Sequence, residues 1–361
     1  VGSDAFTCSQ LWRQVSAECS PAPACGHHRG YWNGRYCERC SEIADQNEIE
    51  FDMNKITKLS LIVLFLGIVI TISKAQSYSK EVLERITKVE NGLRANIRFT
   101  NDALWTMDER MKFHKINGVS IAVIHDYKLE WSKAYGFADV NMGQNLTTET
   151  RFQAASISKS VNAMGVLNLV QKKKLDLNAD INDYLTSWKF PYSSVSGNKK
   201  ITTALLLSHT AGLRENGYAG YSRKQTLPTI PQILGGQKPA NSPAVQSIYL
   251  PGLKFEYAGG GVLISQLLIM DVTKLDYEDY MQKNVLRPLG MTNSSFDPPS
   301  PQMTVATGYT ETGEEVEGKY RIYPEQAAAG LWTTPVDLAR FIIQTQMSYE
   351  GKSSKVLSEQ T

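Results

Sequence analysis

Apolar side chains between residues 80 and 139 recur at two different spacings. In KEVLERITKVENGL, residues 80–93, they fall on one helical face, which predicts an amphipathic helix, and residues 101–115 predict a second helix. In residues 118–139, apolar and polar side chains alternate on both sides of a polar turn at 125–128. Alternation of this kind predicts a β-hairpin.

Helical patterns predominate in the rest of the chain. Helices are predicted at 156–172, 262–273 and 334–346, the last with Thr334 as its N-cap. Residues 191–256 are rich in Gly, Pro and Ser, which predicts a long irregular stretch with one short helix at TTALLLSHTAGL. A strand hairpin followed mainly by helices predicts an α+β fold, with helices packed on a sheet.

Composition limits the class of protein. Hydrophobic residues make up 42% and charged residues 20% of the 361 residues, as in an ordinary globular protein. The formal net charge is only +2 and no basic patch dominates, so we expect no nucleic-acid partner. The charge is uneven, because residues 1–52 carry −4 and residues 53–361 carry +6, and all five cysteines lie between Cys8 and Cys40. The sequence therefore predicts a boundary near residue 53.

The segment after this boundary has the features of a secretory signal peptide. Lys55 and Lys58 form a positive head, residues 59–73 carry no charge, and Ser-Lys-Ala at 73–75 fits a small-x-small cleavage site. A helix of this uncharged length spans roughly 22 Å, short of the ~30 Å hydrocarbon core. A signal peptide at 53–75 is therefore favoured over a permanent membrane anchor.

A signal peptide at this position predicts that the natural protein starts at Met53. Residues 1–52 are then upstream translated sequence, and residues 76–361 form an exported domain, secreted or periplasmic in a bacterium, that meets the membrane only through its signal segment. A retained anchor would leave this domain membrane-bound. The alternative for residues 1–52 is a cysteine-rich metal module, although its spacing matches no established zinc motif. Its candidate ligands are Cys25, His27, His28, Cys37 and Cys40.

Several common catalytic motifs do not occur in the sequence. It contains no Gly-x-Ser-x-Gly, no His-Glu-x-x-His and no Walker A motif, and AGGGVL at 258–263 lacks the glycine spacing of dinucleotide-binding loops. Only His114, His125 and His209 follow residue 52, so a Ser-His-Asp triad has few candidates. An acyl-transfer enzyme built from this chain would use a base other than histidine.

A Ser-x-x-Lys pair, Ser156 and Lys159, supplies a candidate nucleophile and base one helical turn apart. The structural alternative is that Ser156 caps a helix and Lys159 is a solvated side chain of its first turn. Spacing alone does not decide, because the pattern occurs twice more. These other pairs are Ser77/Lys80 and Ser196/Lys199.

The flanking segments distinguish the pair at Ser156. FQAASISKS is followed by LLSHTAGL, PGLKFEYAGGGVLISQLL and AAAGLWTTPVDLARF. Four segments in this order resemble the serine beta-lactamase superfamily, and the class C-like branch matches best. The resemblance runs from about Met107 to the end of the sequence.

This resemblance implies a beta-lactamase/transpeptidase-like fold, with an antiparallel sheet flanked by helices and a mainly helical subdomain. It also implies a Ser-Lys-Tyr acyl-enzyme mechanism, in which Ser156 is the nucleophile, Lys159 the base and Tyr257 the proton shuttle. No cofactor or metal is needed by that chemistry. His209 is expected to be a structural contact near the site.

Two departures from the family pattern affect the expected activity. Gly259 stands at a substrate-binding position where the family usually has asparagine, and it cannot make the amide contact, which favours an esterase or peptidase over an efficient beta-lactamase. The downstream Lys-Thr-Gly or His-x-Gly strand does not occur before Thr361, so we expect a fragment that lacks its carboxyl-terminal strands. Those strands would pair with the hairpin at 119–137, whose edges would otherwise be open to association.

These features together predict an exported serine hydrolase acting on ester or amide substrates, including peptides and beta-lactam-like compounds. Its partner would be a small-molecule or peptide acyl substrate, and no feature indicates an oligomeric state. The alternative is a catalytically silent penicillin-binding-type sensor of cell-wall peptides. Intact Ser156, Lys159 and Tyr257 argue against a silent protein. A membrane-tethered metal module, a third possibility, would rest on residues 1–52 alone.

Overall fold

The computed structural model describes residues 78–94, 103–214, 217–300 and 302–361. All of them belong to one of the two units into which the chain divides, Ser77–Thr361. The upstream sequence 1–52 and the signal peptide 53–75 lie outside the described residues, so both stay predictions. In the described part of the chain, no helix combines the length and the apolar character that crossing a bilayer requires.

The predicted β-hairpin is present, as the alternation of apolar residues indicates. β1 (Gly118–His125) and β2 (Lys128–Asp139) pair antiparallel. Asp126 and Tyr127 connect them with φ values of +49° and +58°, the left-handed conformation that two-residue hairpin turns favour. β3 (Gln144–Asn145) pairs with β2, so that among the described strands β1 pairs with β2 alone.

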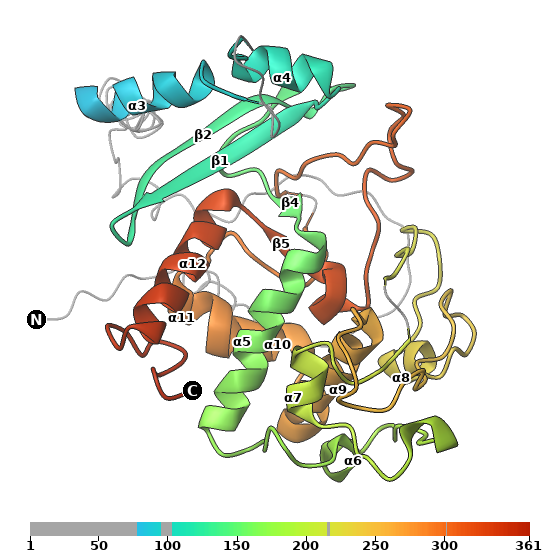
Figure 1. The fold of residues 1–361 in the computed structure, drawn as a ribbon. Coiled ribbons are helices and arrows are strands. Elements are labelled where there is room, and N and C mark those ends of the chain that lie inside the picture. Colours follow the sequence, from blue (N-terminus) through green and yellow to red (C-terminus); the bar gives the residue numbers. More distant parts are fainter. Residues whose placement is uncertain (1–77, 95–102, 215–216, 301) are drawn as a thin grey trace, which may run out of the picture. The chain divides into compact units, whose positions relative to one another are not determined.

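Two helices accompany the hairpin (Figure 1). They are α3 (Lys80–Glu90) and α4 (Met107–Phe113), and both fall within the predicted helical segments. α4 begins later than its pattern suggests because Thr106 and Glu109 form a capping box. The Thr106 hydroxyl accepts from the Glu109 amide, and the Glu109 carboxylate accepts from the Thr106 amide.

A second, two-stranded sheet brings together segments far apart in the sequence. β4 (Phe152–Gln153) pairs antiparallel with β5 (Trp332–Thr333). β4 leads into the 3₁₀ turn η1 (Ala155–Ile157) and then α5 (Ser158–Gln171). The pairing therefore holds the start of α5 beside the segment that precedes β5, a relationship visible in Figure 1.

The last helix confirms its predicted cap. α12 (Pro335–Tyr349) follows β5, and the Thr334 hydroxyl accepts a hydrogen bond from the Asp337 amide. This bond satisfies one of the amides that a helix start leaves without an intrahelical partner.

The remaining described chain is mainly helical. Its central helix, α9 (Gly259–Thr273), is apolar on all sides and buried, as expected for a helix inside a core. Val262 and Ile269 pack in the same cluster as α5 side chains, whereas Leu263 and Leu267 pack with side chains of the shorter helices. The elements are α6 (Ile181–Tyr184), η2 (Ser194–Ser196), α7 (Thr203–Leu207), α8 (Ile230–Leu234), α9 (Gly259–Thr273), α10 (Tyr277–Met281), the π-helical η3 (Gln282–Leu286), α11 (Arg287–Leu289) and the π-helical η4 (Gln326–Gly330).

The α+β class is confirmed, as a mixture of helices and small antiparallel sheets, but some boundaries differ from the prediction. The central helix α9 starts at Gly259, three residues before the predicted range, because its glycines allow close packing. A Cβ on Gly260 would lie 2.9 Å from the backbone oxygen of Arg214. The stretch 191–256 holds α8 in addition to the predicted short helix. No element was predicted at 277–289, where α10, η3 and α11 follow one another.

Candidate active site

Ser156 lies in η1, where the chain passes from β4 into α5. The preceding residue, Ala155, has a φ of +44°, a left-handed conformation that is strained for a side chain with a Cβ. The alternative in which Ser156 caps α5 is wrong, because Ile157 occupies the N-cap and no side chain caps this helix. The Ser156 side chain is exposed, and its hydroxyl is available for other contacts.

Lys159 is not a solvated surface side chain, so that alternative is also wrong. Its Nζ donates to Ser156 Oγ at 3.1 Å and to the carbonyl oxygen of Ala328 at 2.6 Å. Ala328 belongs to η4, the π-helical segment before β5. The side chain is therefore held from two directions, on one side by the serine and on the other by backbone 169 residues away in the sequence.

Tyr257 completes the cluster from the loop that precedes α9. Its hydroxyl donates to Ser156 Oγ at 3.0 Å, and Lys159 Nζ lies 5.2 Å from its ring centroid. Burial alone would raise the pKa of the Tyr257 phenol, but the hydrogen bonds to Lys159 and Ser156 and the lysine charge outweigh it and lower the pKa. The three side chains that the resemblance selected are thus brought together.

His209 lies next to this cluster, as expected for a structural contact. Its ring centroid is 4.6 Å from that of Tyr257, and its Nδ1 accepts a hydrogen bond from the Ala258 amide. Burial and the neighbouring Lys159 charge lower the pKa of His209.

The other predicted positions are placed as follows. Gly259 is the first residue of α9 and is buried, and its role in substrate binding stays a prediction. Ser196 is buried and its hydroxyl pairs with that of Ser247 at 2.8 Å, which accounts for it structurally. Ser77 lies outside the described residues.

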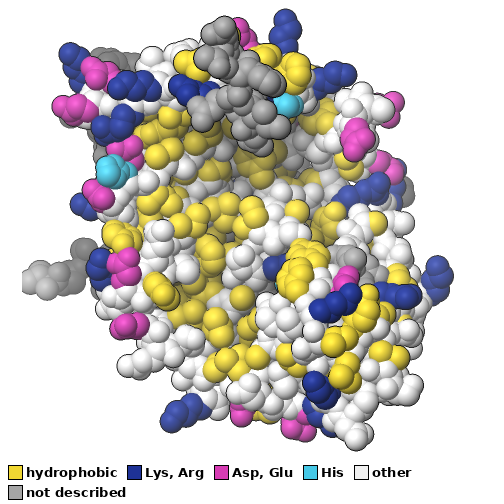
Figure 2. Space-filling view, in the orientation of Figure 1, with side chains coloured by type: hydrophobic (Ala, Val, Ile, Leu, Met, Phe, Trp, Pro, Cys, Tyr) yellow, Lys and Arg dark blue, Asp and Glu magenta, His cyan; other side chains and the backbone are white. Residues whose placement is uncertain are grey.

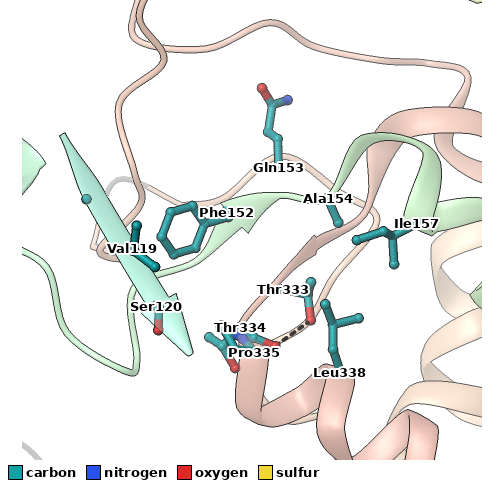
Figure 3. A pocket seen from close by; sticks show the side chains of 11 residues that line it. Val119, Ser120, Phe152, Gln153, Ala154, Ile157, Thr333, Thr334, Pro335 and Leu338 are labelled. Atoms are coloured by element: carbon teal, nitrogen blue, oxygen red, sulfur yellow. Dashed lines mark hydrogen bonds between the residues drawn. The ribbon is translucent and has the colours of Figure 1, made fainter. Parts of the chain in front are cut away.

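A pocket of about 340 Å³ lies beside Ile157, the residue after Ser156. Val119 and Ser120 of β1 line one side, and Phe152, Thr334 and Leu338 are among the residues lining the rest (Figure 3). Figure 2 shows apolar side chains gathered on this face, between the β1–β2 hairpin and α5. Ala154 and Ile157, which flank Ser156 in the sequence, line this pocket, whereas Ser156, Lys159 and Tyr257 are not among its lining residues.

Two features of the site were not predicted from the sequence. One is the carbonyl of Ala328, which lies within AAAGLWTTPVDLARF but carries no side-chain signal. The other is the positive φ of Ala155, because alanine is not a residue type that indicates a left-handed conformation. Across the residues described, no three His, Cys, Asp or Glu side chains gather as metal ligands. The cysteine-rich segment lies outside that range.

Comparison with known proteins agrees with this geometry. A family model described as Beta-lactamase matches residues 106–361. The chain belongs to this family. The resemblance inferred from four sequence segments is thereby confirmed, and the match begins within one residue of the predicted Met107.

Comparison with a known sequence and with solved structures shows what the chain is similar to. Protein flp of Staphylococcus aureus (strain N315) is 27% identical over 246 residues, 66% of this chain and 46% of flp, so the chain spans about half the length of that relative. The octameric penicillin-binding protein homologue from Pyrococcus abyssi has a TM-score of 0.58 and 26% identity, covering 70% of this chain and 57% of that one. The D-amino acid amidase from Ochrobactrum anthropi SV3 shares the fold, with a TM-score of 0.59 and 21% identity over 78% of this chain and 72% of the amidase.

Proposed function

We propose that this protein is a serine hydrolase that forms an acyl-enzyme on Ser156. The observation that carries the proposal is the position of Ser156 Oγ, 3.1 Å from Lys159 Nζ and 3.0 Å from the Tyr257 hydroxyl. A serine hydroxyl is a weak nucleophile unless a neighbouring group takes its proton. Two groups capable of holding that proton lie within hydrogen-bond reach.

In the first step, Ser156 Oγ attacks the substrate carbonyl carbon while its proton passes to Lys159 Nζ, which acts as the base. The negative charge that develops on the carbonyl oxygen needs a donor, and the backbone amide of Ser156 would supply one. When the tetrahedral intermediate collapses, the bond to the leaving group breaks. The leaving oxygen or nitrogen takes a proton from Tyr257, which recovers one from Lys159.

In the second step, water attacks the acyl carbon and loses its proton to the same Tyr257–Lys159 pair. The bond to Ser156 Oγ then breaks, and this oxygen takes the proton back from the Tyr257–Lys159 pair. The Ala328 carbonyl orients Lys159 throughout, since it accepts a hydrogen bond from Nζ at 2.6 Å. Residues of this chain perform each proton transfer, in keeping with general acid–base catalysis.

The substrate class we propose is an ester or an amide, with peptides and beta-lactam-like compounds included. Similarity to a penicillin-binding protein homologue and to a D-amino acid amidase supports carbonyl substrates of this kind. Gly259, in place of an asparagine, favours esters or peptides over penicillins. We further propose that the domain is exported, secreted or periplasmic, through the segment 53–75.

The second candidate is a sensor that is acylated but does not turn over. Similarity to penicillin-binding proteins favours it, and the two functions differ in the rate of deacylation. The test is to incubate the full-length protein with p-nitrophenyl esters, nitrocefin and D-amino-acid dipeptides. Continued product release over many equivalents identifies the hydrolase, whereas one equivalent followed by a stable adduct identifies the sensor. Equal turnover by wild type and Ser156→Ala would refute both.

A further inference from the structure

His209 makes three separate contacts with the chain around Tyr257. Its carbonyl oxygen accepts from the Glu256 amide at 2.8 Å, and its Nδ1 accepts from the Ala258 amide at 3.2 Å. Its ring lies against the Tyr257 ring, with centroids 4.6 Å apart and planes inclined at 35°. The residue before Tyr257, the residue after it and its own ring are all held by one histidine.

The backbone of His209 makes this arrangement possible. α7 ends at Leu207, Ser208 follows as its C-cap, and His209 has a φ of +56°. A left-handed residue after a helix turns the chain sharply. Here the turn brings both the carbonyl and the imidazole of His209 to the Tyr257 loop, which is also anchored by a bond from the Gly252 amide to the Thr210 carbonyl.

The contact with Ala258 has a local reason as well. Ala258 is the N-cap of α9 and has no side chain able to cap the helix. The imidazole of His209 accepts a hydrogen bond from the Ala258 amide, so a side chain and not a backbone carbonyl is the acceptor for this amide. The start of α9, and with it the position of Tyr257, therefore depends on an acceptor from a different element.

We infer that His209 is a positioning residue that holds the Tyr257 hydroxyl on Ser156 through these contacts. The inference rests on the proposed acyl-transfer function and concerns the placement of its proton shuttle. Because Nδ1 is occupied by a backbone amide and the ring faces Tyr257, His209 is assigned no proton transfer of its own.

The role requires neutral His209, with its proton on Nε2, because a protonated Nδ1 cannot accept from Ala258. The groups facing the ring agree with this state. Burial, followed by the charge of Lys159 on α5, lowers the pKa of His209. The Tyr257 ring lies against the imidazole, and the centroid of the Phe255 ring lies 5.9 Å from that of His209. The backbone amide of Glu256 donates to the His209 carbonyl oxygen. The Glu256 carboxylate pairs instead with Lys254, whose Nζ lies 3.5 Å away.

The lowered pKa of His209 predicts how activity falls at low pH, the acid limb of the pH profile. The pKa of His209 is lowered below its usual 6.5, so the ring is neutral above that pH. The Ala258 bond is lost as pH falls through the lowered folded-state pKa. Wild-type acylation is therefore expected to decline over that lower range.

The test compares two substitutions in the full-length protein. His209→Asn keeps an acceptor near the Nδ1 position and suits a positive φ, whereas His209→Phe keeps the ring without an acceptor. We expect His209→Phe to lower kcat for ester hydrolysis roughly 10- to 100-fold with little change in KM, because the shuttle is misplaced. His209→Asn should recover most of this loss and lose the part of the acid limb that His209 contributes. His125→Asn, on an exposed histidine, is the matched control.

Amide hydrogen exchange at Ala258 gives a readout that does not depend on activity. Exchange should accelerate in His209→Phe and stay near the wild-type rate in His209→Asn. Equal kcat in wild type and His209→Phe, equal impairment of both variants, or unchanged exchange at Ala258 would overturn the inference. Failure of the proposed function would differ, since wild type would then not be acylated on Ser156 whatever the exchange data show.

Discussion

The hydroxyl of Tyr257 donates to Ser156 Oγ at 3.0 Å although 101 residues separate the two in the sequence. The contact joins two segments that lie far apart in the sequence, the 3₁₀ turn before α5 and the loop before α9. Lys159 reaches the same oxygen from one helical turn away. Two side chains from different elements therefore converge on the Ser156 oxygen.

Removing the phenol hydroxyl tests its part in proton transfer. Tyr257→Phe keeps the ring contact with His209 and loses the hydrogen bonds of the hydroxyl to Ser156 and Lys159. We expect kcat for ester hydrolysis to fall about 10²- to 10⁴-fold, while the free energy of unfolding changes by less than about 1 kcal/mol. Stopped-flow kinetics and urea denaturation measure the two quantities. Tyr349→Phe, on an 83% exposed tyrosine, is the control, and activity equal in both variants would contradict the role.

The glycines at the start of α9 give a prediction about stability. A Cβ on Gly260 would lie 2.8 Å from Val245 Cγ2 and 2.9 Å from the Arg214 backbone oxygen, whereas one on Gly261 would lie 3.5 Å from its nearest neighbours, Leu206 and Leu213. Gly260→Ala should therefore destabilise the protein by about 1 to 3 kcal/mol.

Gly261→Ala is the matched control for this change. It should be neutral or stabilising by up to about 1 kcal/mol, because alanine is the better helix former and the space exists. Urea denaturation of both variants gives the comparison. A larger loss for Gly261→Ala than for Gly260→Ala would show that close packing does not explain the glycine run.

Much of this architecture follows from local sequence signals. The hairpin is predictable because side-chain alternation and a two-residue turn determine it together. The cap at Thr334 is predictable because its hydroxyl accepts a hydrogen bond from the amide three residues later, at Asp337. Ser156 and Lys159 lie one helical turn apart, although the flanking segments, and not the spacing, distinguish this pair from two other Ser-x-x-Lys pairs. These are all interactions between residues close in the chain.

Other parts were not predictable because they depend on distant backbone. The Ala328 carbonyl reaches Lys159 through the folding of η4, which no side chain signals. The early start of α9 reflects close approach to Arg214, which a hydrophobic pattern does not show. The capping box of α8, formed by Thr229 and Gln232, is a local sequence signal for a helix, although the surrounding Gly- and Pro-rich composition predicts irregular structure.

A buried carboxylate at the end of β2 predicts a pH dependence of stability. Asp139 is 1% exposed, and it accepts from Lys319 Nζ, the Thr307 hydroxyl and the Met142 amide. The hydrogen bond from Lys319, followed by those from Met142 and Thr307, lowers the pKa of Asp139 to about 2. A depressed carboxylate pKa stabilises the fold above the unfolded-state value, and this contribution is lost as pH falls toward 2.

Asp139→Asn should therefore lower the free energy of unfolding at pH 7 by about 2 kcal/mol. The difference between wild type and variant should shrink by roughly half at pH 3, since the unfolded state then binds more protons than the folded state. Urea denaturation at both pH values measures it. A difference that stays constant or grows between pH 7 and pH 3 would contradict the assignment to this carboxylate.

The most direct test of the account is the covalent labelling of Ser156. The full-length protein is treated with a fluorophosphonate probe, and its intact mass and peptide map are measured by mass spectrometry beside Ser156→Ala and Ser208→Ala, the latter an exposed serine outside the cluster. We predict one adduct on the peptide containing Ser156 in wild type and Ser208→Ala, and none in Ser156→Ala. An adduct that persists in Ser156→Ala, or that maps to another residue in wild type, would contradict the assignment of Ser156 as the nucleophile.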